Sequence, residues 1–73
     1  MPKPNDVERL LTSHEAARIL GVSQAWLERK RYERAGPPFV RVGGPNGRAV
    51  RYRQSDIAQW VNDNLVVPER PAP

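Results

Sequence analysis

Apolar and polar residues in this chain follow a helical period first, then a period of two, then a helical period again. The first helical segment is 13–20, whose apolar side is formed by Ala16, Ala17, Ile19 and Leu20. Thr12 and Glu15 stand three residues apart in the pattern of a capping box, which predicts that the helix begins after Thr12. Gly21 follows, and glycine readily takes the left-handed conformation that ends a helix.

A second helix is predicted from Ser23, a favourable N-cap residue, to about Ala35. Its inward apolar anchor is Leu27, and the glycine and prolines at 36–38 end it because proline cannot continue a helix. Only two residues separate this helix from the first. A helix-turn-helix is therefore the favoured geometry.

The period of two appears in segments 39–42 and 49–52, which are predicted to be β-strands. Residues 43–48 between them are rich in turn-forming residues, so the strands should form a hairpin. By parity, the valines and Tyr52 form one apolar face, which must pack on the helices because an isolated hairpin is marginally stable. Arginines fall on the opposite parity, at Arg41, Arg51 and Arg53.

A last helix is predicted to begin near Ser55, the N-cap candidate, with a buried stripe made of Ile57, Trp60, Val61 and Leu65. Segment 6–11 fits either a short helical turn or an extended segment. We expect one domain at residues 6–67, between loosely ordered tails at 1–5 and 68–73. The pattern predicts a mostly α-helical fold with a two-stranded β-hairpin.

Charge is distributed unevenly along the 73 residues, which carry a formal net charge of +4. Eight of the twelve basic residues lie between Arg29 and Arg53, with Glu33 as the single acid among them. A basic centre of this kind is typical of a surface that binds an anion, and nucleic acid is the commonest such partner. The alternative is a basic face that only contacts solvent.

The residue types give little support for chemistry other than binding. The chain has no cysteine and one histidine, His14, which excludes disulfides and a metal site built from several such ligands. The glycine-rich segment 43–47 lies between two strands and lacks the following lysine, so it is not a phosphate-binding P-loop. No apolar run is long enough to span a bilayer, and we expect no secretory signal because residues 1–6 lack an apolar stretch. We expect no enzymatic activity, cofactor, metal, membrane or small-molecule substrate, and a cytoplasmic location.

The second helix of a helix-turn-helix lies in the DNA major groove. Its predicted outward positions are Gln24, Ala25, Glu28, Arg29 and Tyr32. Gln24 can pair with adenine, and Arg29 with guanine or a phosphate. Glu28 can accept from cytosine or orient Arg29, and the Tyr32 hydroxyl can reach a phosphate.

Basic residues on the flanks of this helix and on the hairpin form a second predicted contact. Lys30, Arg31 and Arg34 should touch phosphate or cover apolar surface with their stems. Arg41, Arg48 and Arg51 should point together toward a minor groove or along the backbone. Trp26 either packs in the core, the favoured position, or lies beside the DNA.

Three segments resemble, in order, the MerR-type helix-turn-helix domains of the excisionase and AlpA-like group. Residues 11–23 (LTSHEAARILGVS) resemble its opening, 36–44 (GPPFVRVGG) its helix-to-wing junction, and 50–61 (VRYRQSDIAQWV) its wing return and closing helix. The resemblance covers about residues 10–62 and implies a small winged-helix DNA-binding domain. Residues 45–47 lengthen the wing tip relative to the usual form.

The same resemblance implies a function and partners. The group includes recombination directionality factors of phages and mobile elements, which bind and bend attachment-site DNA and assist an integrase in excision. It implies a protein of a bacterial host cell that binds double-stranded DNA, contacts an integrase and associates head to tail with itself on DNA. The alternatives are an AlpA-like transcriptional regulator that binds a promoter, and an adaptor whose basic face binds an acidic protein.

Overall fold

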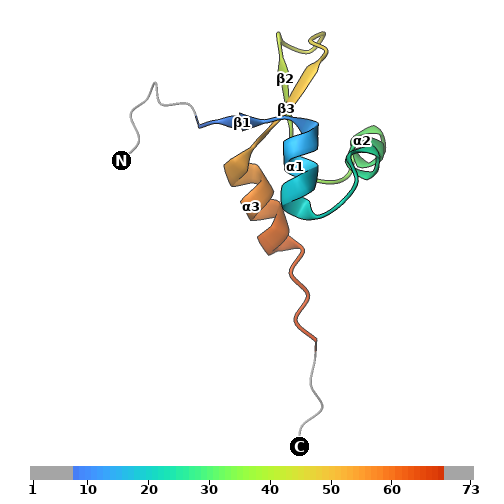
Figure 1. The fold of residues 1–73 in the computed structure, drawn as a ribbon, viewed down its shortest axis with the longest axis vertical. Coiled ribbons are helices and arrows are strands. Elements are labelled where there is room, and N and C mark those ends of the chain that lie inside the picture. The colour runs from blue at the N-terminus through green and yellow to red at the C-terminus, as the bar shows by residue number, and fades with distance from the viewer. Residues whose placement is uncertain (1–7, 69–73) are drawn as a thin grey trace, which may run out of the picture.

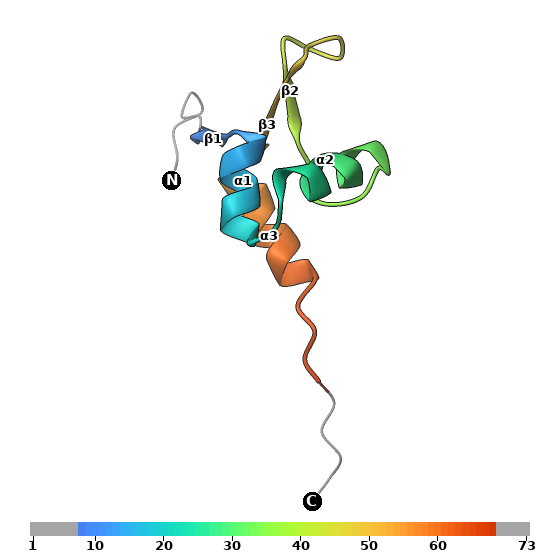
Figure 2. The same ribbon diagram turned by 45° about the vertical axis from the view of Figure 1, so that its right-hand side comes forward.

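The computed structural model describes residues 8–68, which form three helices and a three-stranded antiparallel sheet (Figure 1). The elements are β1 (Leu10–Leu11), α1 (Ser13–Leu20), α2 (Gln24–Tyr32), β2 (Val40–Val42), β3 (Ala49–Arg53) and α3 (Gln54–Asp63). The hairpin of β2 and β3, the wing, projects beyond the helices, and α2 lies on the side of α1 away from β1 (Figures 1 and 2). This architecture is that of a small winged helix-turn-helix domain, as predicted. The expected loose ends at 1–5 and 68–73 lie outside the described residues, apart from Pro68.

The predicted ends of the first two helices are confirmed by their hydrogen bonds. The Thr12 hydroxyl accepts from the Glu15 backbone N–H at 3.1 Å, and the Glu15 carboxylate accepts from the Thr12 backbone N–H at 2.9 Å. Gly21 ends α1 with a φ of 71°, in the left-handed region. The Ser23 hydroxyl then caps α2 by accepting from the Trp26 backbone N–H at 3.0 Å. Local sequence therefore determines the helix-turn-helix geometry.

The C-terminal end of α2 differs from the prediction, because the helix ends at Tyr32 rather than near Ala35. Arg34 has a φ of 59° and is the only non-glycine residue of positive φ among residues 8–68. Its backbone N–H donates to the Arg31 carbonyl at 3.1 Å, and the Ala35 N–H donates to the Lys30 carbonyl at 2.8 Å. These two bonds form a Schellman motif, in which the left-handed residue is usually glycine.

A third strand joins the predicted hairpin. Leu11 pairs with Tyr52 and Leu10 with Arg53, so β1 lies on the far side of β3 from β2. The sequence allowed either a short helical turn or an extended segment at residues 6–11. The part of this segment that the structure describes is extended. This strand places Leu11 in the core.

The register of the wing contradicts the predicted distribution of its arginines. Val40 pairs with Arg51 and Arg41 pairs with Val50. Directly opposite residues share a face of the sheet, so Arg41 lies on the face of Val50 and Tyr52, and Arg51 lies on the other face. The prediction that the two arginines point together is wrong, because alternation within each strand does not determine the register between strands.

The start of α3 also differs from the prediction. Arg53 occupies the N-cap position without a side-chain cap, and Ser55 lies inside the helix. The Glu8 carboxylate accepts from the Ser55 backbone N–H at 3.0 Å and from its hydroxyl at 2.6 Å. These bonds lower the pKa of Glu8, with the Ser55 hydroxyl contributing most. A residue 47 positions away thus provides the N-terminal anion that stabilises α3.

The core is small and is shared by β1, β3 and all three helices. It consists of Leu11, Ala16, Ala17, Leu27, Tyr52 and Ile57. Trp26 is half-buried and packs against this cluster, in agreement with the favoured core position. The predicted stripe of α3 is wrong at its far end: Trp60 is half-buried, but Val61 and Leu65 are exposed. The C-terminal half of α3 extends past the end of α1 and so has less to pack against (Figures 1 and 2).

Candidate nucleic-acid interface

The outer side of α2 carries the residues predicted to read DNA. The exposed members of that set are Gln24, Ala25, Arg29 and Tyr32, and Glu28 is half-buried. Leu27 is 1% exposed and holds the opposite side of the helix against the core. The described chain therefore leaves this side of α2 open to solvent.

A hydrogen bond links two of the predicted base-reading side chains. Gln24 Nε2 donates to Glu28 Oε2 at 2.9 Å. Glutamine reads adenine by donating and accepting at the same time, which requires its amide nitrogen. The amide nitrogen carries two N–H donors, so Gln24 can keep its bond to Glu28 and still offer its second N–H and its carbonyl oxygen to adenine.

Lys30 lies among the residues of α2 that pack rather than among those that face solvent. Its Nζ lies 5.3 Å from the centre of a Trp26 ring and 3.4 Å from Glu33 Oε1. Its stem also limits the space at Gly36, where an added Cβ would lie 3.1 Å from Lys30 Cβ. Of the two predicted roles for Lys30, this environment matches coverage of apolar surface.

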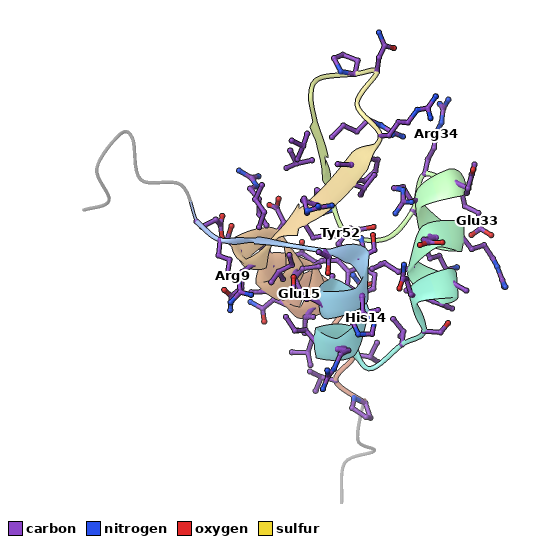
Figure 3. The ribbon with its side chains drawn as sticks, turned by 45° about the horizontal axis from the view of Figure 1, so that its top comes forward. Arg9, His14, Glu15, Glu33, Arg34 and Tyr52 are labelled. Atoms are coloured by element: carbon purple, nitrogen blue, oxygen red, sulfur yellow. The ribbon has the colours of Figure 1, made fainter. Side chains whose placement is uncertain are left out.

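Two adjoining hollows separate the end of α2 from the wing. The larger, of about 640 Å³, is lined by Arg31, Tyr32 and Arg34, residues 35–38, Phe39 and Arg41. The smaller, of about 180 Å³, is lined by Arg31, Tyr32, Arg41, Arg48 and Val50. Figure 3 shows Arg34 extending from the end of α2 toward the wing. Together the hollows form one concave surface, the arginine cleft, made by Arg31, Arg34, Arg41 and Arg48 with Tyr32.

Two wing arginines do not belong to this cleft. Arg51 is half-buried on the other face of the hairpin, and its guanidinium donates to the Val50 carbonyl at 2.8 Å. Arg53 forms an ion pair with Asp56 at 2.6 Å, and the hydrogen bond to that carboxylate raises the pKa of Arg53. The predicted alignment of Arg51 with Arg41 and Arg48 is therefore wrong.

Arg31 and Arg34 are the cleft residues that sequence reasoning assigned only to the flanks of the helix. Arg31 follows the buried Leu27 by four residues, so it lies on the inward side of α2, where its guanidinium donates to the Tyr52 hydroxyl at 3.2 Å. That spacing is a sequence signal for an arginine between helix and wing. Arg34 gave no such signal, because its direction depends on the left-handed turn that ends α2.

A comparison with known families agrees with this geometry. A sequence model described as a helix-turn-helix domain matches residues 10–65, which is most of the chain. The chain belongs to this helix-turn-helix family. A search of curated proteins gives no match. As a helix-turn-helix domain, the protein binds double-stranded DNA sequence-specifically, and α2 is the helix at the position of the recognition helix.

Within residues 8–68, no helix has the length and apolar character needed to cross a membrane. The same residues contain no group of three or more histidine, cysteine or acidic side chains that could hold a metal ion.

Proposed function

We propose that this protein is an excisionase, a recombination directionality factor that binds and bends attachment-site DNA and assists an integrase in excision. The helix-turn-helix family to which the chain belongs includes excisionase-like and AlpA-like members. The three segments at 11–23, 36–44 and 50–61 resemble that group. The proposal rests on this resemblance together with the cationic surface described above.

The observation that carries DNA recognition is the continuity between the outer side of α2 and the arginine cleft. Tyr32 is 88% exposed and belongs to both. With α2 in a major groove, the cleft would lie beside the adjoining backbone and the wing would reach the next minor groove. A helix and wing in this arrangement contact only a short stretch of DNA. Useful affinity would therefore come from several copies bound head to tail on neighbouring sites.

Two substitutions test which contacts read sequence. If Arg29 reads a base, Arg29→Ala should weaken binding to the protein's specific DNA site by about 1–3 kcal/mol and relax its sequence specificity. Arg48→Ala should weaken binding to specific and unrelated duplexes alike, if Arg48 touches only backbone. Fluorescence anisotropy with both duplexes measures the two effects. If both variants lose a negligible amount of affinity, the proposed placement of α2 and the wing on DNA is wrong.

Excision itself provides the test of the finer proposal. Footprinting on DNA that flanks the gene identifies the sites, and a reaction with the integrase encoded nearby should form excision product only when this protein is added. DNA fragments of equal length that carry the site at different positions should, when bound, migrate most slowly through a gel if the site lies in the middle of the fragment, because a bend there shortens the end-to-end distance of the fragment most. Binding at a promoter with no effect on excision would instead identify an AlpA-like regulator, which would use the same surface.

A gel-shift experiment separates both DNA-based functions from an adaptor. An adaptor that binds an acidic protein through the cleft would bind DNA weakly and without regard to sequence. Sequence-dependent shifts that become cooperative on tandem sites support the proposal and its head-to-tail association. Independent filling of tandem sites would contradict that association.

A further inference from the structure

The arginine cleft concentrates positive charge without a compensating acid. Its two hollows are lined by four arginines, and no residue within 8–68 that lines either hollow is acidic. The ion pairs of the described chain involve Arg9, Lys30 and Arg53, all outside the cleft. Like charges that converge in this way repel one another until an anion lies between them.

Two of these guanidinium groups are held against one aromatic ring. The guanidinium carbon of Arg31 lies 5.7 Å from the centre of the Phe39 ring, and that of Arg41 lies 5.4 Å from it. Both distances are within the range of cation–π attraction. The Phe39 ring lies 6.3 Å from the ring of Tyr52, which is buried, so the rigid core supports it.

Each guanidinium has a second fixed contact. Arg31 donates to the Tyr52 hydroxyl at 3.2 Å, and Arg41 donates to the Gly47 carbonyl at 3.3 Å. Each contact uses one of the five N–H donors of the group, which leaves donors for a ligand. Arginine held in position before binding loses less conformational entropy when the ligand arrives.

We propose that Phe39 positions Arg31 and Arg41 for the sugar–phosphate backbone of a single DNA strand, at one phosphate or two adjacent phosphates. The inference rests on the proposed DNA binding and adds a defined subsite between α2 and the wing. In DNA the anion is phosphate, and the planar guanidinium can donate to two of its oxygens at once. Because both cations lie against one ring, they can reach only a short segment of backbone. Phe39 acts through the two arginines and is a positioning residue.

The test uses the full chain and a labelled duplex that carries the strongest footprinted site. Neutral methylphosphonates replace the phosphates one at a time, and anisotropy gives the affinity for each duplex. For the wild type, replacement at the cleft position should weaken binding roughly fivefold to tenfold. For Arg41→Ala, which has already lost the contact, the same replacement should have a much smaller effect while the remaining positions keep theirs.

Three further variants distinguish positioning from general damage. Phe39→Leu should reduce the sensitivity at the same position, and Phe39→Trp, which keeps an aromatic face, should preserve it. Arg51→Ala removes the same charge from the opposite face of the hairpin and should keep the complete wild-type pattern. Circular dichroism identifies a variant that is unfolded, and Phe39→Trp and Arg41→Ala then decide the result.

The outcomes separate this subsite from DNA binding as such. If Arg41→Ala and Phe39→Leu lose affinity equally at every phosphate, or if Arg51→Ala alters the pattern, the subsite is wrong and DNA binding stands. If the wild type binds no duplex, the proposed function is wrong and the subsite with it.

Discussion

Arg34→Gly is expected to stabilise this protein while weakening its binding to DNA. Arg34 has a φ of 59°, and a left-handed backbone costs an L-residue about 1–2 kcal/mol but costs glycine almost nothing. Glycine loses more conformational freedom on folding, which offsets about 0.5–1 kcal/mol of this gain. The free energy of unfolding should therefore rise by about 0.5–1 kcal/mol, equivalent to a Tm increase of roughly 2–8 °C in a domain of this size.

The same substitution removes a guanidinium that lines the larger hollow. If Arg34 contacts phosphate, its loss weakens binding to all duplexes alike and reduces the slope of log K against log salt by about 0.9. Stability and affinity then change in opposite directions. Damage to the fold would lower both, so the sign of the two changes identifies the cause.

Urea unfolding followed by circular dichroism gives the stability, and anisotropy titrations at several salt concentrations give the binding. Arg34→Ala is the matched control, because it removes the charge but keeps the Cβ that makes φ of 59° unfavourable. Its stability should stay within about 0.5 kcal/mol of the wild type, and its affinity should fall as in Arg34→Gly. A less stable Arg34→Gly protein would refute the strain argument, and unchanged affinity would refute the phosphate contact.

Two other predictions concern the parts of the fold that support α1 and α2. The hydrogen bond from the Thr12 backbone N–H lowers the pKa of Glu15 below its ordinary 4.5, so the stability it confers is complete above that pH and is lost as pH falls through the lowered pKa. Glu15→Gln keeps an acceptor without a titrating group, so urea unfolding should lose stability less steeply below pH 4.5 than the wild type, and equal slopes would contradict this. Leu27→Ala should lower the free energy of unfolding by about 2–5 kcal/mol because Leu27 is fully buried. The same change at Leu65, which is 69% exposed, should cost under about 0.5 kcal/mol, and similar losses at both positions would show that Leu27 does not anchor α2.

The features predicted correctly are those determined by neighbouring residues. The capping box at Thr12, the left-handed Gly21 and the cap at Ser23 each depend on residues within four positions, and each is present in the structure. Leu27, predicted as the inward anchor of α2 just after its N-cap, is buried as expected. The helix-turn-helix was predictable because its geometry is local.

The incorrect predictions concern distant partners or backbone conformation. Ser55 has the residue type of an N-cap, but Glu8 takes that role from the other end of the chain. Both wing strands alternate valine and arginine, so the sequence allows either register, and only the observed pairing separates Arg41 from Arg51. A shift of one residue moves every side chain to the other face. The end of α2 depends on a left-handed arginine, for which residue type gives no signal.

The register also changes how many of the basic residues can bind DNA. Of the eight between Arg29 and Arg53, Lys30, Arg51 and Arg53 pack or bond elsewhere. Five remain on the α2 and cleft surface: Arg29, Arg31, Arg34, Arg41 and Arg48. Each phosphate contact contributes about 0.9 to the slope of log K against log salt, so five basic residues give a slope no steeper than about −4.5, whereas eight would give about −7.

Anisotropy titrations on a duplex with a single site, over a range of KCl concentrations, measure this slope directly. Arg41→Ala combined with Arg48→Ala should reduce its magnitude by about 1.8, because both side chains belong to the cleft. Arg51→Ala should leave it unchanged, since Arg51 lies on the other face of the wing. A wild-type slope near −7, or a shallower slope in Arg51→Ala, would mean that both faces of the hairpin contact DNA. The wing would then have to insert edge-on into the minor groove with both of its faces against DNA, rather than contact DNA through the cleft face alone.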